Sequence, residues 1–371
     1  MAFVFEEYRL DDVGTDPALD RGGLLRQTAT AAAQVRQART AAAESGLAAL
    51  ADDGRPRSVV VLGTGVAAFA GAVLETLSGT GSPVPVRTVT GYRLPGWVGA
   101  HDLVVAVSAG SGRETDPTVR TAMEAVRRGS RFAAVGPRGG PLAGVAEQAR
   151  APHVALPLPG EPRTLLWSLV VPLLLAVEQV GVRVAADADL EATAALLEDV
   201  AQRCRPAADV YANPAKELAL AFADALPVVW GATPVAALAA RWAAAQFAAN
   251  VRIPALAAGQ PEAVWAQSAV PTGPLGAGGP RSIFDDPEDE RGVRMRVLLF
   301  RDDQALPEEA ADLAAAERAA EEAGVRVSEV AAQGASPMER LAGLIALTDY
   351  ATLYLAVAYA VEPLTNTLVV R

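Results

Sequence analysis

The sequence predicts an α/β protein of two similar halves, each with a mostly parallel sheet flanked by helices. Short apolar runs rich in β-branched residues alternate with helical segments along most of the chain. This alternation is typical of parallel strands that are joined by helices and covered on both faces. A glycine turn follows a strand in each half, at Gly63-Thr64-Gly65 and at Gly231-Ala232-Thr233-Pro234. The second half therefore resembles a weaker copy of the first.

Composition narrows the class of protein. The 371 residues suffice for two or three ordinary domains, and the net charge of −11 argues against a nucleic-acid or anionic-membrane partner. The single cysteine, Cys204, allows no internal disulfide, so a cytoplasmic location is the default. The acidic start lacks the apolar segment of a signal peptide, and the most apolar run, Leu165–Val180, is too short to cross a bilayer.

The first half is expected to contain five strands and five helices. The strands are predicted at 58–62, 85–90, 102–107, 132–135 and 153–158. The helices are predicted at 24–50, at 66–77, at 117–128, after Gly139-Gly140-Pro141, and from Pro162-Arg163 to about Gly181.

The second half is expected to be of similar size and to contain three strands and three helices. Strands are predicted at 227–230, 296–300 and 325–330, and helices at 235–250, 308–322 and 337–359. The domain boundaries follow: an acidic segment and packing helix over 1–54, a first domain over 55–185, a linker helix over 186–209 and a second domain over 210–371. Within the second domain, residues 272–296 are rich in Gly, Pro and acids and are expected to form a mobile loop.

The first glycine turn is the stretch around which the chain is organised. Ser58–Leu62 reads as a buried strand, Gly63-Thr64-Gly65 as a turn, and the following residues as a helix, which is the layout that aims backbone N–H groups at an anion. The spacing Gly63-x-Gly65-x-x-Ala68 also satisfies the loose dinucleotide pattern. The next strand ends without the acidic residue that holds a ribose, and Arg87 lies in mid-strand, which disfavours that alternative.

A second loop adds hydroxyl groups. Ser108, Ser111 and Thr115 supply hydroxyls, while Gly110 and Gly112 expose N–H groups before a helix. Hydroxyls and N–H groups at a helix N-terminus form a phosphate-binding loop without a lysine. A connecting loop with only a capping role is the alternative.

Several motifs together resemble one family, the bifunctional phosphoglucose/phosphomannose isomerases, which have two sugar-isomerase (SIS) domains. In the first half the motifs are Gly63-Thr64-Gly65, the run from Tyr92 to Val98, Val105-Ala106-Val107-Ser108, the run from Gly139 to Ala143 and Pro162-Arg163. In the second half they are Asn213-Pro214-Ala215-Lys216, Arg241-Trp242, Gln246-Phe247, Asn250, Ile253-Pro254-Ala255, Pro261-Glu262, Asp349-Tyr350-Ala351, Tyr354-Leu355-Ala356 and Glu362-Pro363. The resemblance spans about 57 to 363 and implies two SIS-type α/β/α sandwiches.

The resemblance implies interconversion of aldose and ketose 6-phosphates. It implies that a sugar phosphate binds to Gly63, Thr64, Gly65, Ser108, Ser111, Gly112 and Thr115. The loop departs from the family at Arg113, where we expect an added charge-assisted phosphate contact that the family lacks. It implies that Arg163 lies by the reacting carbons, where a guanidinium stabilises enediolate charge. It also implies a homodimer whose subunits complete each other's sites. We expect no cofactor and no metal.

The chain departs from the family at the groups that move protons. The family's base Glu corresponds to Ala249, and its ring-opening His to Trp265. The family's functional Lys in a final helix has no counterpart up to Arg371, because the only lysine, Lys216, belongs to another motif. Two function classes remain: a binder of sugar phosphate that is weak or silent in catalysis, and an isomerase with a relocated base, for which Glu262 is the candidate.

Overall fold

The computed structural model describes residues 4–20, 22–110, 116–274 and 294–363. The chain divides into two compact units, residues 29–195 and residues 1–28 with 196–371. The boundary at 195/196 falls inside one helix, α8 (Asp187–Arg203). The predicted mobile loop at 272–296 lies mostly outside the described residues, and its last residues, from Arg294, already belong to a strand.

The unit of residues 29–195 contains a five-stranded parallel sheet in the order β2-β1-β3-β4-β5. The strand order reverses at β1, so that its two neighbours are the next two strands of the chain. This is the doubly wound arrangement, in which ligands bind beyond the carboxyl ends of the strands at the point of reversal. The strands are β1 (Val59–Leu62), β2 (Val86–Val89), β3 (Leu103–Val107), β4 (Arg131–Pro137) and β5 (His153–Leu156).

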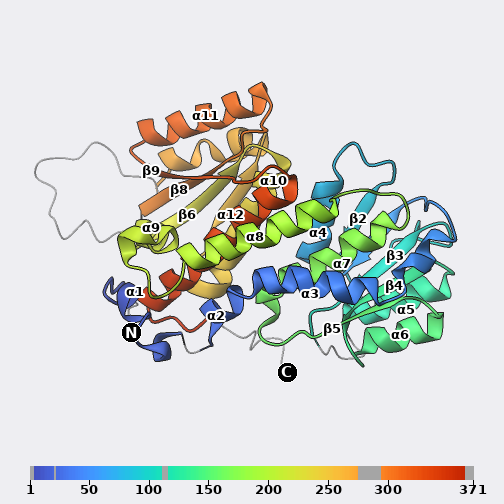
Figure 1. The fold of residues 1–371 in the computed structure, drawn as a ribbon. Helices are drawn as coiled ribbons and strands as arrows, with labels where there is room; N and C mark the ends of the chain where they lie inside the picture. Colours follow the sequence, from blue (N-terminus) through green and yellow to red (C-terminus); the bar gives the residue numbers. More distant parts are fainter. Residues whose placement is uncertain (1–3, 21, 111–115, 275–293, 364–371) are drawn as a thin grey trace, which may run out of the picture. The chain divides into compact units, whose positions relative to one another are not determined.

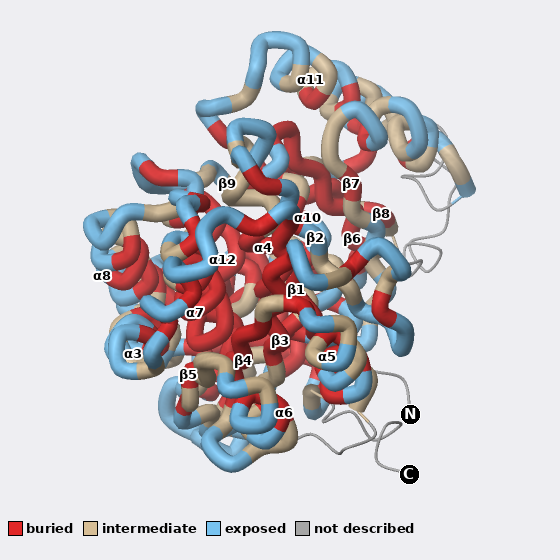
Figure 2. The backbone as a smooth tube through the Cα atoms, turned by 90° about the vertical axis from the view of Figure 1, so that its right-hand side faces the viewer, coloured by how far each residue is buried: buried red, intermediate tan, exposed pale blue. Residues whose placement is uncertain are grey.

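Helices cover both faces of this first sheet. Alternate residues such as Val60 and Val104 pack against α5 (Pro117–Arg127) and α6 (Pro141–Ala149). The opposite face meets α4 (Val66–Ser78), whose Gly71 lies so close to Val61 that an added Cβ would be 2.9 Å from its side chain. Beside α4, α7 (Leu166–Glu178) packs against β4, and next to it α3 (Ala31–Ala43) packs against β5. Since both faces are covered, β1 and β3 are buried throughout, as Figure 2 shows.

The second unit repeats this topology with one strand fewer. Its parallel sheet has the order β7-β6-β8-β9, with β6 (Ala225–Gly231), β7 (Leu256–Gly259), β8 (Arg294–Arg301) and β9 (Arg326–Ala331). Val228 and Trp230 pack against α11 (Pro307–Glu322) on one face, and α10 (Pro234–Gln246) and α12 (Pro337–Ala358) lie on the other (Figure 1). The predicted copy relationship is thus visible as a shared strand order.

Most predicted elements are present, but two take another form, and helices α1 (Arg9–Asp12) and α9 (Pro214–Ala221) and strand β7 were not predicted. The expected helix over 24–50 consists of α2 (Leu24–Thr28), α3 and a 3₁₀ turn (Leu47–Ala51), because Gly46 adopts a left-handed φ of 77° after α3. The helix expected from Pro162-Arg163 begins as a 3₁₀ turn (Pro162–Thr164) before α7. Strand β7 was not predicted, since Leu-Ala-Ala-Gly has neither β-branched residues nor alternation.

Helix α12 is long and apolar enough to cross a membrane, by length and composition alone. Within the protein, 83% of its most apolar 18-residue window is buried, as expected of a helix at the centre of a domain. It carries buried Leu, Ile and Tyr residues on all sides, because α9 (Pro214–Ala221) and α10 pack against it.

The amino edge of the first sheet is held by a buried carboxylate. Asp102 accepts hydrogen bonds from Arg57 Nε (3.0 Å), the Ser58 hydroxyl (2.7 Å) and the Gly99 N–H (2.9 Å). Burial disfavours its charge, but these three donors outweigh the burial and hold the pKa of Asp102 below its ordinary value. The carboxylate therefore joins the starts of β1 and β3.

Asp102→Asn is expected to lower the free energy of unfolding at pH 7 by about 2–3 kcal/mol, because charged hydrogen bonds are lost and Arg57 loses its counter-charge. The loss should shrink as the pH falls through the folded-state pKa, where the parent carboxylate is itself protonated. Urea unfolding at several pH values measures it. The matched control is Asp53→Asn, since Asp53 is 66% exposed and 3.4 Å from Arg131, and should cost under about 0.5 kcal/mol. Equal losses for both variants would contradict this assignment.

Candidate functional site

The first switch point, defined as the turn Gly63–Gly65 together with Ser108, lies where the strand order reverses between β1 and β3. Gly63 ends β1 against α4, and an added Cβ would lie 2.9 Å from the carbonyl carbon of Ala67. Gly65 has a φ of 57° with open space around it, and Thr64 is exposed. The N-terminus of α4 is therefore accessible and follows a turn that only glycine fits, as an anion site requires.

Ser108 follows β3 directly beside this turn. Its N–H donates to the carbonyl of Val135 (3.0 Å), and its hydroxyl donates to the carbonyl of Gly110 (3.1 Å). An added Cβ at Gly136 would be 3.1 Å from the Ser108 carbonyl oxygen, so β4 approaches this loop closely. The structure thus brings Gly63, Thr64, Gly65 and Ser108 to adjacent strand ends. The other predicted phosphate contacts, Ser111, Gly112, Arg113 and Thr115, lie outside the described residues.

Arg163 follows β5, two strands beyond β3 in the sheet order. Its side chain is half-buried, and burial lowers its pKa below the ordinary value, an effect that the nearby Glu161 partly offsets. A cation that has lost part of its hydration gains most from a bound anion. Arg163 therefore lies on the ligand-binding edge of this sheet, although not beside the turn.

The second switch point is built from Thr233, after β6, and Asp302, after β8. The Thr233 hydroxyl caps α10 by accepting from Ala236 N–H (3.1 Å) and donates to Asp302 Oδ2 (2.7 Å). Arg340 Nε lies 3.1 Å from Asp302 Oδ1. All three residues are buried. Sequence reasoning missed Asp302 and Arg340; the available signal was an acidic residue directly after a strand in the repeated half.

Ala249 and Trp265 match the family's proton-transfer positions. In the second sheet they lie at opposite ends of the strands, Ala249 near the amino ends and Trp265 at the carboxyl ends. Helix α10 starts at the carboxyl edge and runs back along β6 and β7, so Ala249, in the turn that follows it, lies near the amino edge. Trp265 follows β7 at the carboxyl edge and is 85% exposed. Glu262 is exposed three residues earlier on the same turn. Within this unit, therefore, Ala249 and Trp265 do not lie together.

One further carboxylate lies between α10 and α12. Asp349 Oδ1 accepts a hydrogen bond of 2.6 Å from the indole N–H of Trp242. Burial raises the pKa of Asp349 to about 7, and the Trp242 hydrogen bond only partly offsets that rise. Among the described residues no Arg, Lys or His pairs with it. Sequence reasoning noted the pairs Arg241-Trp242 and Asp349-Tyr350 as motifs but assigned them no role.

The only lysine is structural. Lys216 is buried and donates to the carbonyls of Pro206 (2.9 Å) and Ala208 (2.6 Å), with Asp11 at 3.5 Å. Its ammonium group also lies over the Tyr354 ring, 5.5 Å from the centroid. The residue therefore joins loop, helix and N-terminal segment within one unit, which explains its place in the Asn213-Pro214-Ala215-Lys216 motif.

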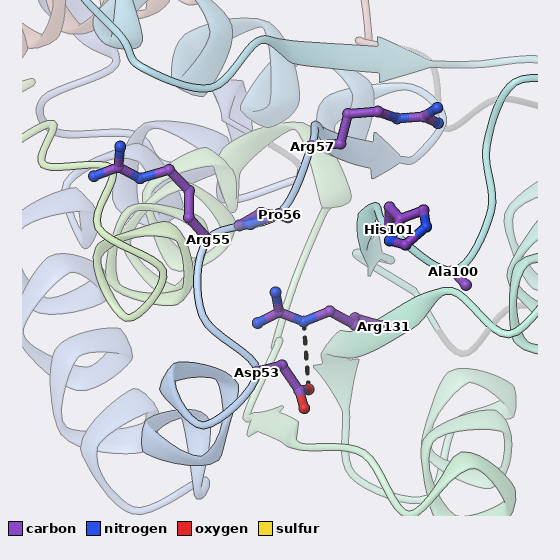
Figure 3. A pocket seen from close by; sticks show the side chains of 7 residues that line it. All are labelled: Asp53, Arg55, Pro56, Arg57, Ala100, His101 and Arg131. Carbon is purple, nitrogen blue, oxygen red and sulfur yellow. Dashed lines mark ion pairs between the residues drawn. The ribbon is translucent and has the colours of Figure 1, made fainter.

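A hollow of about 570 Å³ lies at the amino edge of the first sheet, opposite the first switch point. Arg55, Arg57, Arg131 and His101 line it, but Figure 3 shows the Arg55 and Arg57 side chains pointing away from each other. Arg57 binds Asp102, and Arg131 binds Asp53 and two backbone carbonyls. These cations hold the edge together and do not converge on a ligand. In the described part of the chain, no three His, Cys, Asp or Glu residues gather as metal ligands would.

Comparison with known proteins defines the class. Residues 211–370 match the model of the bacterial phospho-glucose isomerase C-terminal SIS domain. A putative phosphosugar isomerase from Clostridium difficile 630 shares the fold with a TM-score of 0.65 at 12% identity, covering 93% of this chain and 96% of that one. A glucose-6-phosphate isomerase like protein from Thermus thermophilus gives 0.53 at 20% identity, covering 87% and 92%. The second unit is similar to this SIS domain, and both units have the SIS-type fold.

One relative is similar to most of the chain. The bifunctional phosphoglucose/phosphomannose isomerase of Caldicellulosiruptor bescii is 27% identical over 316 residues, which is 82% of this chain and 85% of the relative. The chain is therefore similar, over most of its length, to a bifunctional sugar-phosphate isomerase, and its second half is similar to a phospho-glucose isomerase SIS domain. The expected fold class is thereby confirmed, and the expected resemblance to the bifunctional phosphoglucose/phosphomannose isomerases is supported.

Gly63→Ala is expected to reduce the free energy of unfolding by about 1–3 kcal/mol, because the new Cβ meets backbone atoms of α4 that cannot move independently. It should also weaken any anion bound at the first switch point. Urea unfolding and phosphate titration measure the two effects. The control is Gly144→Ala, on an exposed turn of α6 with nothing near its Cβ, which should gain about 0.5–1 kcal/mol. A Gly63→Ala protein as stable as the parent would refute this account of the turn.

Asp349→Asn is expected to change how stability varies with pH. In the folded parent the pKa of the Asp349 carboxyl is about 7, which is above its value in the unfolded chain. The contribution of this carboxyl to the free energy of unfolding is therefore fully present below about pH 4 and is lost as the pH rises through 7. The variant stays neutral and should gain about 1 kcal/mol or more on the parent between pH 5 and 8. Urea midpoints across this range test it. Trp242 and Tyr350 are the neighbours to monitor, and parallel curves would contradict the raised pKa.

Proposed function

We propose that this chain binds a hexose 6-phosphate and is weak or silent as an aldose–ketose isomerase. The observation that carries the proposal is the pair Ala249 and Trp265 at the positions of the family's base and ring-opening groups. The binding residues and the proton-transfer residues are different side chains. Loss of the second set is therefore compatible with retention of the first.

Phosphate binding is supported by the first switch point. The open turn Gly63–Gly65 exposes N–H groups at the N-terminus of a 13-residue helix, with Thr64 and Ser108 hydroxyls nearby. The helix dipole and the N–H groups favour a dianionic ligand without a lysine. Ser111, Gly112, Arg113 and Thr115 complete the proposed contact set. The lack of an acidic residue after β2 favours a sugar phosphate over a dinucleotide.

Isomerisation needs a group that removes a proton from one carbon and returns it to the next. Alanine at 249 has no proton acceptor, and the indole of Trp265 is only a hydrogen-bond donor. Arg163 is the proposed electrostatic partner of enediolate charge, but it cannot act as a base while it remains protonated. Since general acid–base groups each contribute about 10²- to 10⁴-fold, loss of both predicts a rate roughly 10⁴-fold or more below that of a complete site.

A second candidate is an active glucose-6-phosphate/mannose-6-phosphate isomerase with a relocated base. The observation in its favour is that Glu262 is exposed on the same turn as Trp265, at the carboxyl edge of the second sheet. A carboxylate there is accessible to a ligand. The two candidates differ in turnover and agree on the ligand.

The proposal includes the setting of the protein. We propose a cytoplasmic homodimer without a nucleic-acid or membrane partner, in keeping with the net charge of −11 and the single, buried Cys204. The family resemblance implies that subunits complete each other's sites. The placement of Ala249 and Trp265 at opposite edges of one sheet is consistent with shared sites.

The ligand is tested by calorimetry and thermal shift with fructose 6-phosphate, glucose 6-phosphate, mannose 6-phosphate, NAD and NADP. The hexose phosphates are expected to stabilise the protein by about 2–3 kcal/mol at a hundredfold excess over the dissociation constant. Ser111→Ala combined with Arg163→Ala should weaken the binding at least tenfold, because hydroxyl and guanidinium contacts are both removed. Stabilisation by NAD or NADP alone, or a double variant that binds as tightly as the parent, would overturn the proposal.

A further inference from the structure

The two units share a strand order, so their switch points can be compared residue by residue. In the first unit, the N-cap of α4 is Gly65, which is exposed together with Thr64. In the second, the N-cap of α10 is Thr233 and the residue that follows β8 is Asp302, and both are buried. Where the first unit presents backbone donors to solvent, the second unit already contains a carboxylate of the chain itself.

The Asp302 carboxylate is bound as a ligand anion would be. Oδ2 accepts from the Thr233 hydroxyl (2.7 Å), which is the N-terminal cap of the 13-residue helix α10. Oδ1 accepts from the N–H of Gln304 (3.1 Å) and pairs with Arg340 (3.1 Å). A hydroxyl, a backbone N–H, a guanidinium and a helix N-terminus form the donor set of an oxyanion site.

Arg340 points to a site of this kind independently of the helix. Its side chain is only 8% exposed, and its Nε makes no aligned hydrogen bond although the ion pair to Asp302 is short. Nη1 donates to the carbonyl of Ala335 (2.8 Å), which fixes the guanidinium in place. Within the described residues, Asp302 is the one carboxylate that pairs with this buried cation.

We propose that the second SIS domain retains an oxyanion site of the type proposed for the first, and that the Asp302 carboxylate of the same chain occupies it. The site takes a small oxyanion, a carboxylate or a phosphate, held by Thr233 and Arg340. The inference rests on the proposed function in one respect: it takes the first switch point as the place where the phosphate of an external ligand binds. It follows that the intact chain binds one hexose phosphate and not two.

The test removes the internal anion and supplies an external one. Asp302→Ala leaves Arg340 buried without a counter-charge, so the variant should be destabilised and should recover with formate or inorganic phosphate, measured against chloride at equal ionic strength. Each oxyanion should raise its melting temperature by about 3 °C or more beyond the shift of the parent. Asp302→Asn keeps the volume filled and should show no such extra shift, and Asp303→Asn, at the exposed neighbour, should match the parent.

The single variant Asp302→Ala could fail to fold, so a double variant, Asp302→Ala with Arg340→Met, removes both charges and serves as the control for folding. It should fold in chloride and gain nothing extra from formate or phosphate. If Asp302→Ala gains no more from either anion than Asp302→Asn does, or stays unfolded in both while the double variant folds, the proposal is wrong. A response to formate alone would limit the site to carboxylates and overturn its likeness to a phosphate site.

Calorimetry on the parent separates this inference from the proposed function. One hexose phosphate per chain is the expected result. Two per chain would overturn the occupied second site while supporting the proposed function. If no hexose phosphate binds, the proposed function fails, while the formate and phosphate response of Asp302→Ala still decides the second site.

Discussion

The parallel alignment of the strands is the constraint on which the rest of this molecule depends. Parallel strands need crossover connections, and the helices that make them bury both faces of each sheet. All carboxyl ends then lie at one edge, and the reversal of order at β1 and at β6 places two loops side by side there. The positions of Thr64, Ser108, Thr233 and Asp302 follow from this topology, because each comes one or two residues after a strand next to the reversal.

The two domains use the same edge differently. In the first, glycine keeps the helix N-terminus open, and the polar groups around it face solvent. In the second, Gly231 packs so tightly against Ala236 that an added Cβ would lie 2.4 Å from its carbonyl carbon, and Asp302 satisfies the donors internally. A helix N-terminus needs a negative partner in either case, and the partner comes from solvent in one domain and from the chain in the other. Duplication of a fold therefore does not imply duplication of a site.

The sequence predicted the class, the number of halves and most elements, because runs such as Val59–Leu62 and buried helices such as α7 carry strong periodic or apolar signals. It missed β7, whose short Leu-Ala-Ala-Gly run is a strand only because β6 lies beside it. It identified the glycine turn from local chemistry alone. It could not identify the Asp302–Arg340 or Trp242–Asp349 contacts, since partners 38 and 107 residues apart are brought together by packing that no local pattern encodes. Site residues that lie within a single turn could be predicted from the sequence. Contacts between residues on two separate elements could not.

The central claim is the proposal that this chain binds a sugar phosphate without converting it. The most direct measurement is a coupled assay of fructose 6-phosphate conversion to glucose 6-phosphate and mannose 6-phosphate, run on protein whose saturable binding of the same sugar has been shown by calorimetry. The account predicts saturable binding with turnover at least about a hundredfold below 1 s⁻¹, because Ala249 and Trp265 cannot exchange the protons. Turnover above about 1 s⁻¹ would contradict it and would direct attention to Glu262.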